Sequence, residues 1–238
     1  MYDLRIYFML FVLYSICGWI IEIVNVFIIT KKVVDRGFLI GPYCPIYGCG
    51  AVAMTVFLNK YLSDPIGLFI IAMFICSVLE YITSYLMEKI FKARWWDYSD
   101  DKFNLNGRIS LKTTVLFGLG GLVIMYITNP IFLKILTFIP NTLLTILTIV
   151  VGIIFLADFI ISFNIILNFK KTASNIRKDS TEEITKMVKN ILANKSIFTK
   201  RLVKAFPNVQ AIQVKIDKVK KGKLINEKLS KRTRENNI

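Results

Sequence analysis

Five long runs of apolar residues, separated by short polar stretches, occupy most of the first 170 positions of the chain. A helix needs about 20 apolar residues to cross the hydrocarbon core of a bilayer. The runs predict five transmembrane helices, at residues 6–29, 45–61, 66–87, 113–128 and 143–167. The first run is longer than the apolar core of a signal peptide, so we expect it to remain in the protein as a helix.

A sixth apolar stretch, residues 131–139, is too short to span a membrane and lies between Pro130 and Pro140. Proline lacks a backbone donor and is poorly accommodated inside a helix. We therefore expect an interfacial or re-entrant piece here, or an extension of the fourth helix.

The composition agrees with a membrane protein and concentrates the charge in the tail. The hydrophobic fraction is 55% and the mean hydropathy is +0.56, whereas soluble domains are typically about 45–50% apolar. The formal net charge is +15, and residues 170–238 hold 19 Lys and Arg against 6 Asp and Glu. We predict an all-α fold, with a polytopic helical bundle over residues 1–169 and a basic cytoplasmic tail over residues 170–238. Because the excess charge is confined to the tail, nucleic acid is not an expected partner.

Lysine and arginine also set the expected orientation, because basic loops stay in the cytoplasm. They gather after the first helix, around residues 89–112 and in the tail, which five spans place on one side. We therefore expect the N-terminus outside and the C-terminus in the cytoplasm. Within the tail, apolar positions at helical spacing over residues 184–192, 197–206 and 209–219 predict amphipathic helices. Such helices lie on anionic lipid headgroups, or form a docking platform for a cytoplasmic partner.

The stretch from Asp35 to Gly50, D-R-G-F-L-I-G-P-Y-C-P-I-Y-G-C-G, differs from an ordinary membrane loop. It holds four glycines, two prolines and two cysteines between two apolar runs. Non-helical backbone at membrane depth is tolerated only where protein buries it or where it lines a water-filled cavity. We therefore expect this stretch to form the floor of a polar site inside the bundle.

A second polar stretch, residues 91–112, contains R-W-W-D-Y-S-D-D-K-F-N-L-N-G-R-I-S-L-K. Its aromatic residues suit the headgroup level of a membrane, which is one explanation for them. The acids, amides and arginine crowded into the same loop favour a second explanation, a binding site. The predicted topology places both stretches on one face of the membrane, so we expect them to meet as the two halves of a pocket.

Three acids lie inside predicted spans: Glu22, Glu80 and Asp158. An acid at the centre of a membrane helix costs about 2.5–3.5 kcal/mol on insertion scales, so it should face the interior and have a partner. Arg36 and Arg108 are the expected counter-ions of Glu22 and Glu80. Either these charges pair only to hold the bundle together, or the arginines bind an anionic or amphiphilic headgroup. We expect Asp158 to mark a polar helix end.

Several kinds of chemistry lack the residues they need. The chain has no histidine, no G-x-x-x-x-G-K-[ST] phosphate loop and no recognisable catalytic motif, so an enzymatic activity is not assigned. Two neighbouring cysteines without histidine predict neither a zinc site nor another cofactor. The candidate substrate-binding residues are therefore the polar and aromatic groups of the two stretches and the membrane acids: Glu22, Arg36, Tyr43, Cys44, Tyr47, Glu80, Trp96, Asp97, Asn104 and Arg108.

Four motifs carry a resemblance to a bacterial membrane family: G-W-x-x-E at residues 18–22, R-G-F-L-x-G-P-x-C-P-I-Y-G at 36–48, W-D-Y-S at 96–99 and N-G-R-I-S-L at 106–111. With these motifs the chain resembles the Putative ABC-transporter permease family (type IV, CmpB-like). The resemblance implies a multi-pass protein of the bacterial plasma membrane that acts with a separate cytoplasmic ATPase on a small or lipid-like solute. The residues leave two alternatives open: an integral-membrane enzyme or lipid-binding protein with a headgroup pocket at the cytoplasmic leaflet, and an assembly protein without a substrate.

Overall fold

Helices account for most of the part of the chain that the computed structural model describes, which is residues 2–31, 33, 37–91, 93–175 and 210–211. Arg36 and the amphipathic helices predicted over residues 184–192 and 197–206 lie outside these residues; of the helix predicted over 209–219 only Gln210–Ala211 is described, and it is a strand paired with Ala93–Arg94. The helices are α1 (Leu4–Thr30), α2 (Pro45–Phe57), η1 (Asn59–Tyr61), α3 (Pro65–Phe91), α4 (Leu111–Val123), η2 (Ile124–Thr128), α5 (Asn129–Phe138) and α6 (Asn141–Asn175). Four short strands are β1 (Ala93–Arg94), β2 (Asn104–Leu105), β3 (Ile109–Ser110) and β4 (Gln210–Ala211).

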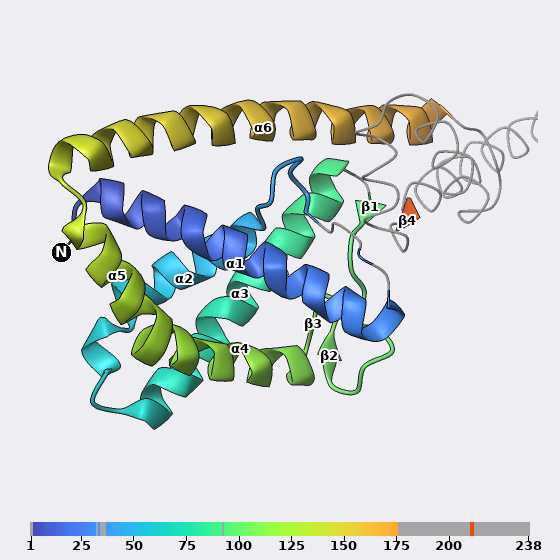
Figure 1. Ribbon diagram of the computed structural model, residues 1–238. Helices are drawn as coiled ribbons and strands as arrows, with labels where there is room; N and C mark the ends of the chain where they lie inside the picture. The colour runs from blue at the N-terminus through green and yellow to red at the C-terminus, as the bar shows by residue number, and fades with distance from the viewer. Residues whose placement is uncertain (1, 32, 34–36, 92, 176–209, 212–238) are drawn as a thin grey trace, which may run out of the picture.

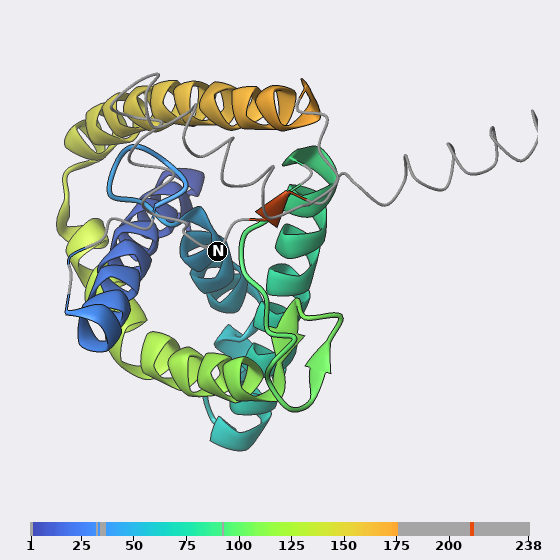
Figure 2. The ribbon, with the colours of Figure 1, turned by 90° about the vertical axis from the view of Figure 1, so that its right-hand side faces the viewer.

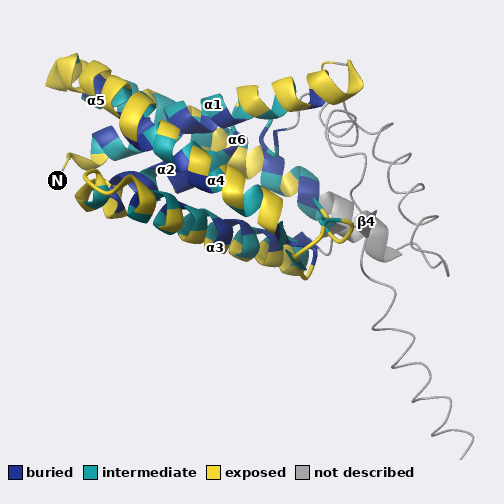
Figure 3. Ribbon diagram, turned by 90° about the horizontal axis from the view of Figure 1, so that it is seen from below, coloured by how far each residue is buried: buried dark blue, intermediate teal, exposed yellow. Residues whose placement is uncertain are grey.

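Among the described residues, four helices are long and apolar enough to cross a membrane: Leu4–Thr30, Pro65–Phe91, Leu111–Phe138 and Asn141–Leu167. These confirm the polytopic helical bundle and four of the predicted spans. Residues 131–139 extend the fourth helix, one of the two expectations for that stretch. Large apolar side chains cover the outside of the bundle, with the buried residues between the helices (Figure 3). This distribution is the one expected when lipid takes the place of water around the protein.

Helix α2 differs from the full span predicted over residues 45–61. It has 13 residues, a length of about 20 Å at 1.5 Å per residue, whereas the hydrocarbon core is about 30 Å thick. After Leu58 the chain turns into the 3₁₀ helix η1. Hydropathy alone counts the apolar residues of both elements together, which explains the longer prediction.

The segment 37–44 supplies the rest of the crossing. The backbone N–H of Cys44 donates to the carbonyl of Ser15, at 2.8 Å, in the middle of α1. Residues 37–44 have no regular structure, and at Cys44 the chain is level with the middle of α1 before α2 begins. Pro45, which needs no hydrogen-bond acceptor, starts the helix at its first position. The prediction of non-helical backbone within the bundle is confirmed for residues 37–44, whereas residues 45–50 of the stretch belong to α2.

Close backbone contacts hold α2 against α1. A Cβ added at Gly48 would collide with the carbonyl oxygen of Phe11 and the hydroxyl of Ser15, and one added at Gly18 would collide with the Tyr47 ring. Small residues permit this kind of close helix approach in membranes. Viewed from the end of the bundle that carries β1–β3, α2 lies inside a ring formed by α1, α4, α3 and α6 (Figures 1 and 2).

The fourth long helix changes its hydrogen-bond pattern in the middle. The N–H of Asn129 donates to the carbonyl of Ile124, the five-residue spacing of a π-helix, and Pro130 follows. The helix bends here, between α4 and α5 (Figure 1). Two polar pairs pack beside the bend: Tyr14 with Thr128 at 2.9 Å, and Thr55 with Asn129 at 3.4 Å. Both pairs are internal contacts of the bundle.

A hairpin occupies the end of the bundle where α1 and α3 end and α4 begins, which we call the loop end. Strands β2 and β3 pair antiparallel, with Leu105 opposite Ile109. Three residues, 106–108, connect the strands; Asn106 and Gly107 have left-handed φ values of 54° and 66°, and the N–H of Arg108 donates to the carbonyl of Leu105 at 3.0 Å, which closes a tight turn. Ser110 then begins α4 through a capping box with Thr113. The hairpin therefore holds the polar loop against the end of α3.

Candidate functional site

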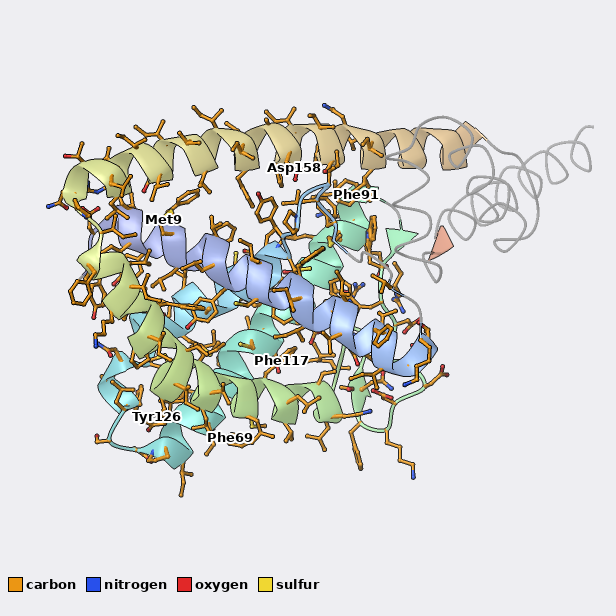
Figure 4. All side chains as sticks on the ribbon, viewed as in Figure 1. Met9, Phe69, Phe91, Phe117, Tyr126 and Asp158 are labelled. Carbon is orange, nitrogen blue, oxygen red and sulfur yellow. The ribbon has the colours of Figure 1, made fainter. Side chains whose placement is uncertain are left out.

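A carboxylate on α6 anchors the irregular segment 37–44. Asp158 accepts hydrogen bonds from two consecutive backbone N–H groups, Ile40 at 2.9 Å and Gly41 at 2.6 Å, and from the Ser162 hydroxyl at 2.9 Å. Figure 4 shows Asp158 on the inner side of α6, directed at this segment. In a membrane interior such donors must find a partner within the protein. Asp158 is therefore a structural anchor, not the polar helix end that we expected from the sequence.

Aromatic side chains join the two polar stretches at the loop end. The Phe38 ring lies 5.9 Å from the ring of Trp95 and 5.9 Å from that of Phe91, measured between centroids. Phe91 in turn lies 5.4 Å from Phe163 on α6. The prediction that the two stretches meet is confirmed for these aromatic residues.

Two acids and two tyrosines form what we call the acid–tyrosine cluster: Glu22 on α1, Tyr47 on α2, Glu80 on α3 and Tyr98 in the loop. The Tyr47 hydroxyl donates to Glu22 Oε1 at 2.7 Å, and the Tyr98 hydroxyl donates to Glu80 Oε1 at 3.1 Å. Glu80 is buried, with 7% of its surface exposed. The cluster lies between the start of α2 and the loop end.

Tyr98 connects the loop to Glu80 by a hydrogen bond and lies close enough to Glu22 to be affected by its charge. Burial raises the pKa of the Tyr98 phenol above its ordinary value of 10.0, and the charge of Glu80 and its hydrogen bond raise it further. The charges of Glu22 and Asp101 act in the same direction with smaller effects. The phenol therefore keeps its proton and remains a donor to Glu80 throughout the physiological range.

A second group, the arginine network, lies beside the cluster. Arg108 donates to Glu88 Oε2 at 2.9 Å and to the Ser84 hydroxyl at 3.3 Å. Its guanidinium carbon also lies 5.7 Å and 5.6 Å from the ring centres of Tyr81 and Tyr85. Arg108 thus pairs with Glu88, whereas the sequence analysis expected it to neutralise Glu22 or Glu80.

Arg94 completes the arginine network on the solvent side. It contacts Glu88 Oε2 and Asp97 Oδ2, each at 3.3 Å. Burial opposes the ionisation of Asp97, but hydrogen bonds from Ser99 and Arg94 outweigh it and hold the pKa of Asp97 below its ordinary value. Both acids of this network are therefore paired with arginine.

Other predicted site residues shape the loop. The indole N–H of Trp96 donates to the carbonyl of Arg108 at 3.2 Å. The Asn104 amide donates to the carbonyls of Ser99 and Asp101, at 3.2 and 2.8 Å, and its oxygen accepts the Gly107 N–H at 3.0 Å. These contacts satisfy backbone groups within the hairpin. Together with the bonds of Asp97 to Ser99 and Arg94, they show that Trp96, Asp97 and Asn104 stabilise the fold of the loop.

The structure divides the predicted residues into two groups. It brings Glu22, Tyr47 and Glu80 together, with Arg108 beside them. Tyr43 instead packs against Phe155 of α6, with 5.7 Å between ring centroids, and Cys44 is buried at the start of α2. Arg36 lies outside the described residues.

Sequence analysis missed the parts played by Asp158, Arg94 and Tyr98. For Asp158 a signal existed, because Ser162 follows it by one helical turn and shares its face. Tyr98 was noticed only as an interfacial aromatic residue. Its contact with Glu80 depends on how the loop folds back over α3, which no local pattern reports.

No group of three or more His, Cys, Asp or Glu side chains that could hold a metal ion occurs among the residues that the structure describes. The four cysteines are free thiols. The chemistry available at the cluster is therefore that of carboxylates and phenols, which bind hydrogen-bond donors and positive charge.

Long apolar helices, an interrupted crossing and buried carboxylates define the class: this is a polytopic integral membrane protein with a polar cluster inside its helical bundle. The chain belongs to the family described as "Putative ABC-transporter type IV", whose model matches residues 9–163. The match extends from α1 into α6 and includes the whole acid–tyrosine cluster. Searches of the curated proteins and of the solved structures find no match.

Proposed function

We propose that this protein is the membrane-spanning permease subunit of a transporter, and that a small or lipid-like solute binds at the acid–tyrosine cluster. The interrupted crossing formed by segment 37–44 and α2 carries this proposal. Transporters commonly place their binding sites where a membrane helix is broken near mid-depth. Here the break lies beside Glu22 and Glu80, and ionisable groups inside a membrane are functional-site candidates by default.

The proposal includes an orientation. The loop after α1 and the loop that contains β1–β3 meet at one end of the bundle, and both are basic. The positive-inside rule favours the cytoplasm for that end, which leaves the N-terminus outside and the basic tail inside. In this orientation the cluster lies in the cytoplasmic half of a bacterial plasma membrane, where the family resemblance also places the protein.

Transport against a gradient needs an energy source. The sequence contains no phosphate-binding loop of the G-x-x-x-x-G-K-[ST] type, so we assign ATP hydrolysis to a separate cytoplasmic subunit, as the family description suggests. The loop end and the tail are the surfaces that this subunit would reach in the proposed orientation.

The test is gentle extraction of the full-length protein from its native membrane, followed by native mass spectrometry. We expect a co-purifying ATPase subunit and a bound solute or lipid. Glu80→Gln should lose the bound molecule and keep the ATPase, while Asp100→Asn, which alters an exposed acid of the same loop, should keep both. Absence of any ATPase under conditions that preserve other transporter complexes would overturn the permease role.

A second candidate, binding of lipid headgroups at the same end, rests on a separate observation. A surface hollow of about 550 Å³ lies between the loop and α4, lined by apolar side chains, one acid and two lysines: Leu111, Val115, Leu116, Asp101, Lys102 and Lys112. An apolar floor beside ammonium groups suits an anionic amphiphile. In the same experiment, retention of anionic lipid that Lys102→Gln and Lys112→Gln abolish, without an ATPase, would favour this candidate.

A further inference from the structure

One oxygen of Glu80 has no hydrogen-bond partner among the described residues. Oε1 accepts the Tyr98 hydroxyl, but Oε2 is buried and has no partner in the part of the chain that the structure describes. Glu80 itself is 93% buried, since 7% of its surface is exposed. Leaving a buried acceptor unpaired costs about 1–3 kcal/mol, and more when it is charged. The described residues therefore leave this acceptor open to a donor that they do not supply.

The two phenol donors of the acid–tyrosine cluster are already used. The hydroxyls of Tyr47 and Tyr98 already donate to Glu22 and Glu80, and each phenol has only one proton to give. Among the described residues, the acid–tyrosine cluster still offers an unpaired acceptor at Glu80 Oε2, with the phenol oxygens beside it. The complementary ligand therefore carries several donors.

The nearest described cations do not neutralise Glu80. Arg108 is held by Glu88, Ser84 and the two tyrosine rings, and Arg94 is held by Glu88 and Asp97. Moving Arg108 to Glu80 would break a short, largely buried ion pair, which is strongly unfavourable. Neither of these two arginines is therefore available to the Glu80 carboxylate.

We propose that the acid–tyrosine cluster binds a protonated primary amine, whose ammonium group donates to Glu80 Oε2 and to the neighbouring oxygens. This inference rests on the proposed function and names the chemical class of its solute. An ammonium group has three donors and one positive charge, which matches an acceptor-lined site at the broken crossing. A quaternary ammonium has the charge without the donors and leaves Oε2 unpaired.

Two sources could present such a group: a free amine, or the headgroup of an amine-bearing lipid that enters from the bilayer. The first arm of the test titrates ethanolamine, with choline as its fully methylated counterpart, into the delipidated full-length protein in detergent. The second arm compares retention of phosphatidylethanolamine and phosphatidylcholine by native mass spectrometry. Binding in the first arm indicates a free amine, and binding in the second alone indicates a lipid.

Wild-type protein should bind the primary amine at least roughly tenfold more tightly than the quaternary one, the factor expected from one charge-assisted hydrogen bond. Glu80→Gln should lose at least as much affinity, and Asp100→Asn should lose none. If Glu80→Gln does not fold, Glu80→Asp keeps the charge but retracts it, and should weaken binding of the primary amine more than that of choline.

Equal affinity for primary and quaternary amines, unchanged binding in the Glu80 variants, or no amine binding in either arm would overturn the inference. These outcomes are separate from the permease role, which is tested by the ATPase that co-purifies. An ATPase without amine binding contradicts only the ligand class, and amine binding without an ATPase contradicts only the permease role.

Discussion

The Asp158 carboxylate and the Gly41 backbone are joined by a hydrogen bond of 2.6 Å between Oδ2 and the amide nitrogen, which links α6 to the interrupted crossing. Asp158→Asn keeps the size of the side chain but turns one acceptor oxygen into a donor. Ile40 also donates to the Ser162 hydroxyl at 3.1 Å, so the exposed loss falls on Gly41 if the new amide group faces it, at a cost of about 1–3 kcal/mol. We expect a lower midpoint of thermal unfolding in detergent. Asp100→Asn is the matched control and should leave the midpoint unchanged.

Two glycines should respond oppositely to the same substitution. Gly48→Ala places a methyl group against the Phe11 carbonyl and the Ser15 hydroxyl, and overpacking of this kind costs about 1–3 kcal/mol. Gly120→Ala meets nothing within 4 Å and gains about 0.5–1 kcal/mol of helix propensity. Unfolding of both variants under identical conditions checks the contrast. Equal stabilities would mean that α1 and α2 are not in backbone contact.

Removing the charge of Glu88 should be among the most damaging changes at the loop end. Glu88→Gln leaves the buried Arg108 guanidinium without its counter-ion, and breaking such a pair typically costs roughly 3–5 kcal/mol. The exposed pair of Asp3 and Arg5 offers the comparison, because surface ion pairs contribute only about 0–1 kcal/mol. Asp3→Asn should therefore change stability little, while Glu88→Gln should reduce folded yield. Similar losses in both variants would argue against the buried pairing of Arg108.

The raised pKa of Tyr98 predicts a loss of stability in alkali. Above the ordinary pKa of 10.0, the phenol of the unfolded chain loses its proton while the native phenol keeps it. The native state then binds more protons than the unfolded state, so stability falls as pH rises. Tyr98→Phe removes this contribution. The difference in unfolding midpoint between wild type and Tyr98→Phe should shrink from pH 8 to pH 11, and a constant difference would contradict the burial of the phenol.

The proposed orientation predicts labelling from opposite sides of the membrane. Lys60 in η1 and Asp100 in the loop between β1 and β2 are both exposed. The turn between α2 and α3, which contains η1, lies at the end of the bundle opposite β1–β3 (Figure 1). In a variant without native cysteines, an impermeant maleimide added to intact cells should modify Lys60→Cys and not Asp100→Cys. Permeabilised cells should show modification of both. The reverse pattern would place the N-terminus in the cytoplasm.

Apolar runs predicted the long helices because a helix that crosses a bilayer needs about 20 apolar residues, however it packs against its neighbours. They overestimated α2, since Leu58 and Tyr61 were counted with the run although the helix ends at Phe57. The irregular stretch was recognised because glycine and proline change what the backbone can do, and this is visible locally.

The partners of the charges were harder to predict. Asp158 binds backbone groups 117 and 118 positions away, and a backbone N–H has no sequence pattern that could announce such a contact. Arg108 was expected at Glu22 or Glu80, but the hairpin turn at Asn106 and Gly107 directs it to Glu88. Charge alone therefore indicated that these residues have partners, and the fold of the loop decided which ones.

The wide turn at Ile124–Thr128 has a mechanical consequence. A π-turn adds a residue to one turn, which rotates everything after it by about 100°, the angle of one residue in a 3.6-residue turn. Before the turn, Gly118 and Gly121 face Phe69 and Ala72 of α3, whereas after it Phe132 packs on Tyr14 of α1. The helix Leu111–Phe138 thus contacts α3 before the π-turn and α1 after it. Any movement of α1 relative to α3 must therefore twist this helix. We expect the π-turn at Ile124–Thr128 to take up the twist.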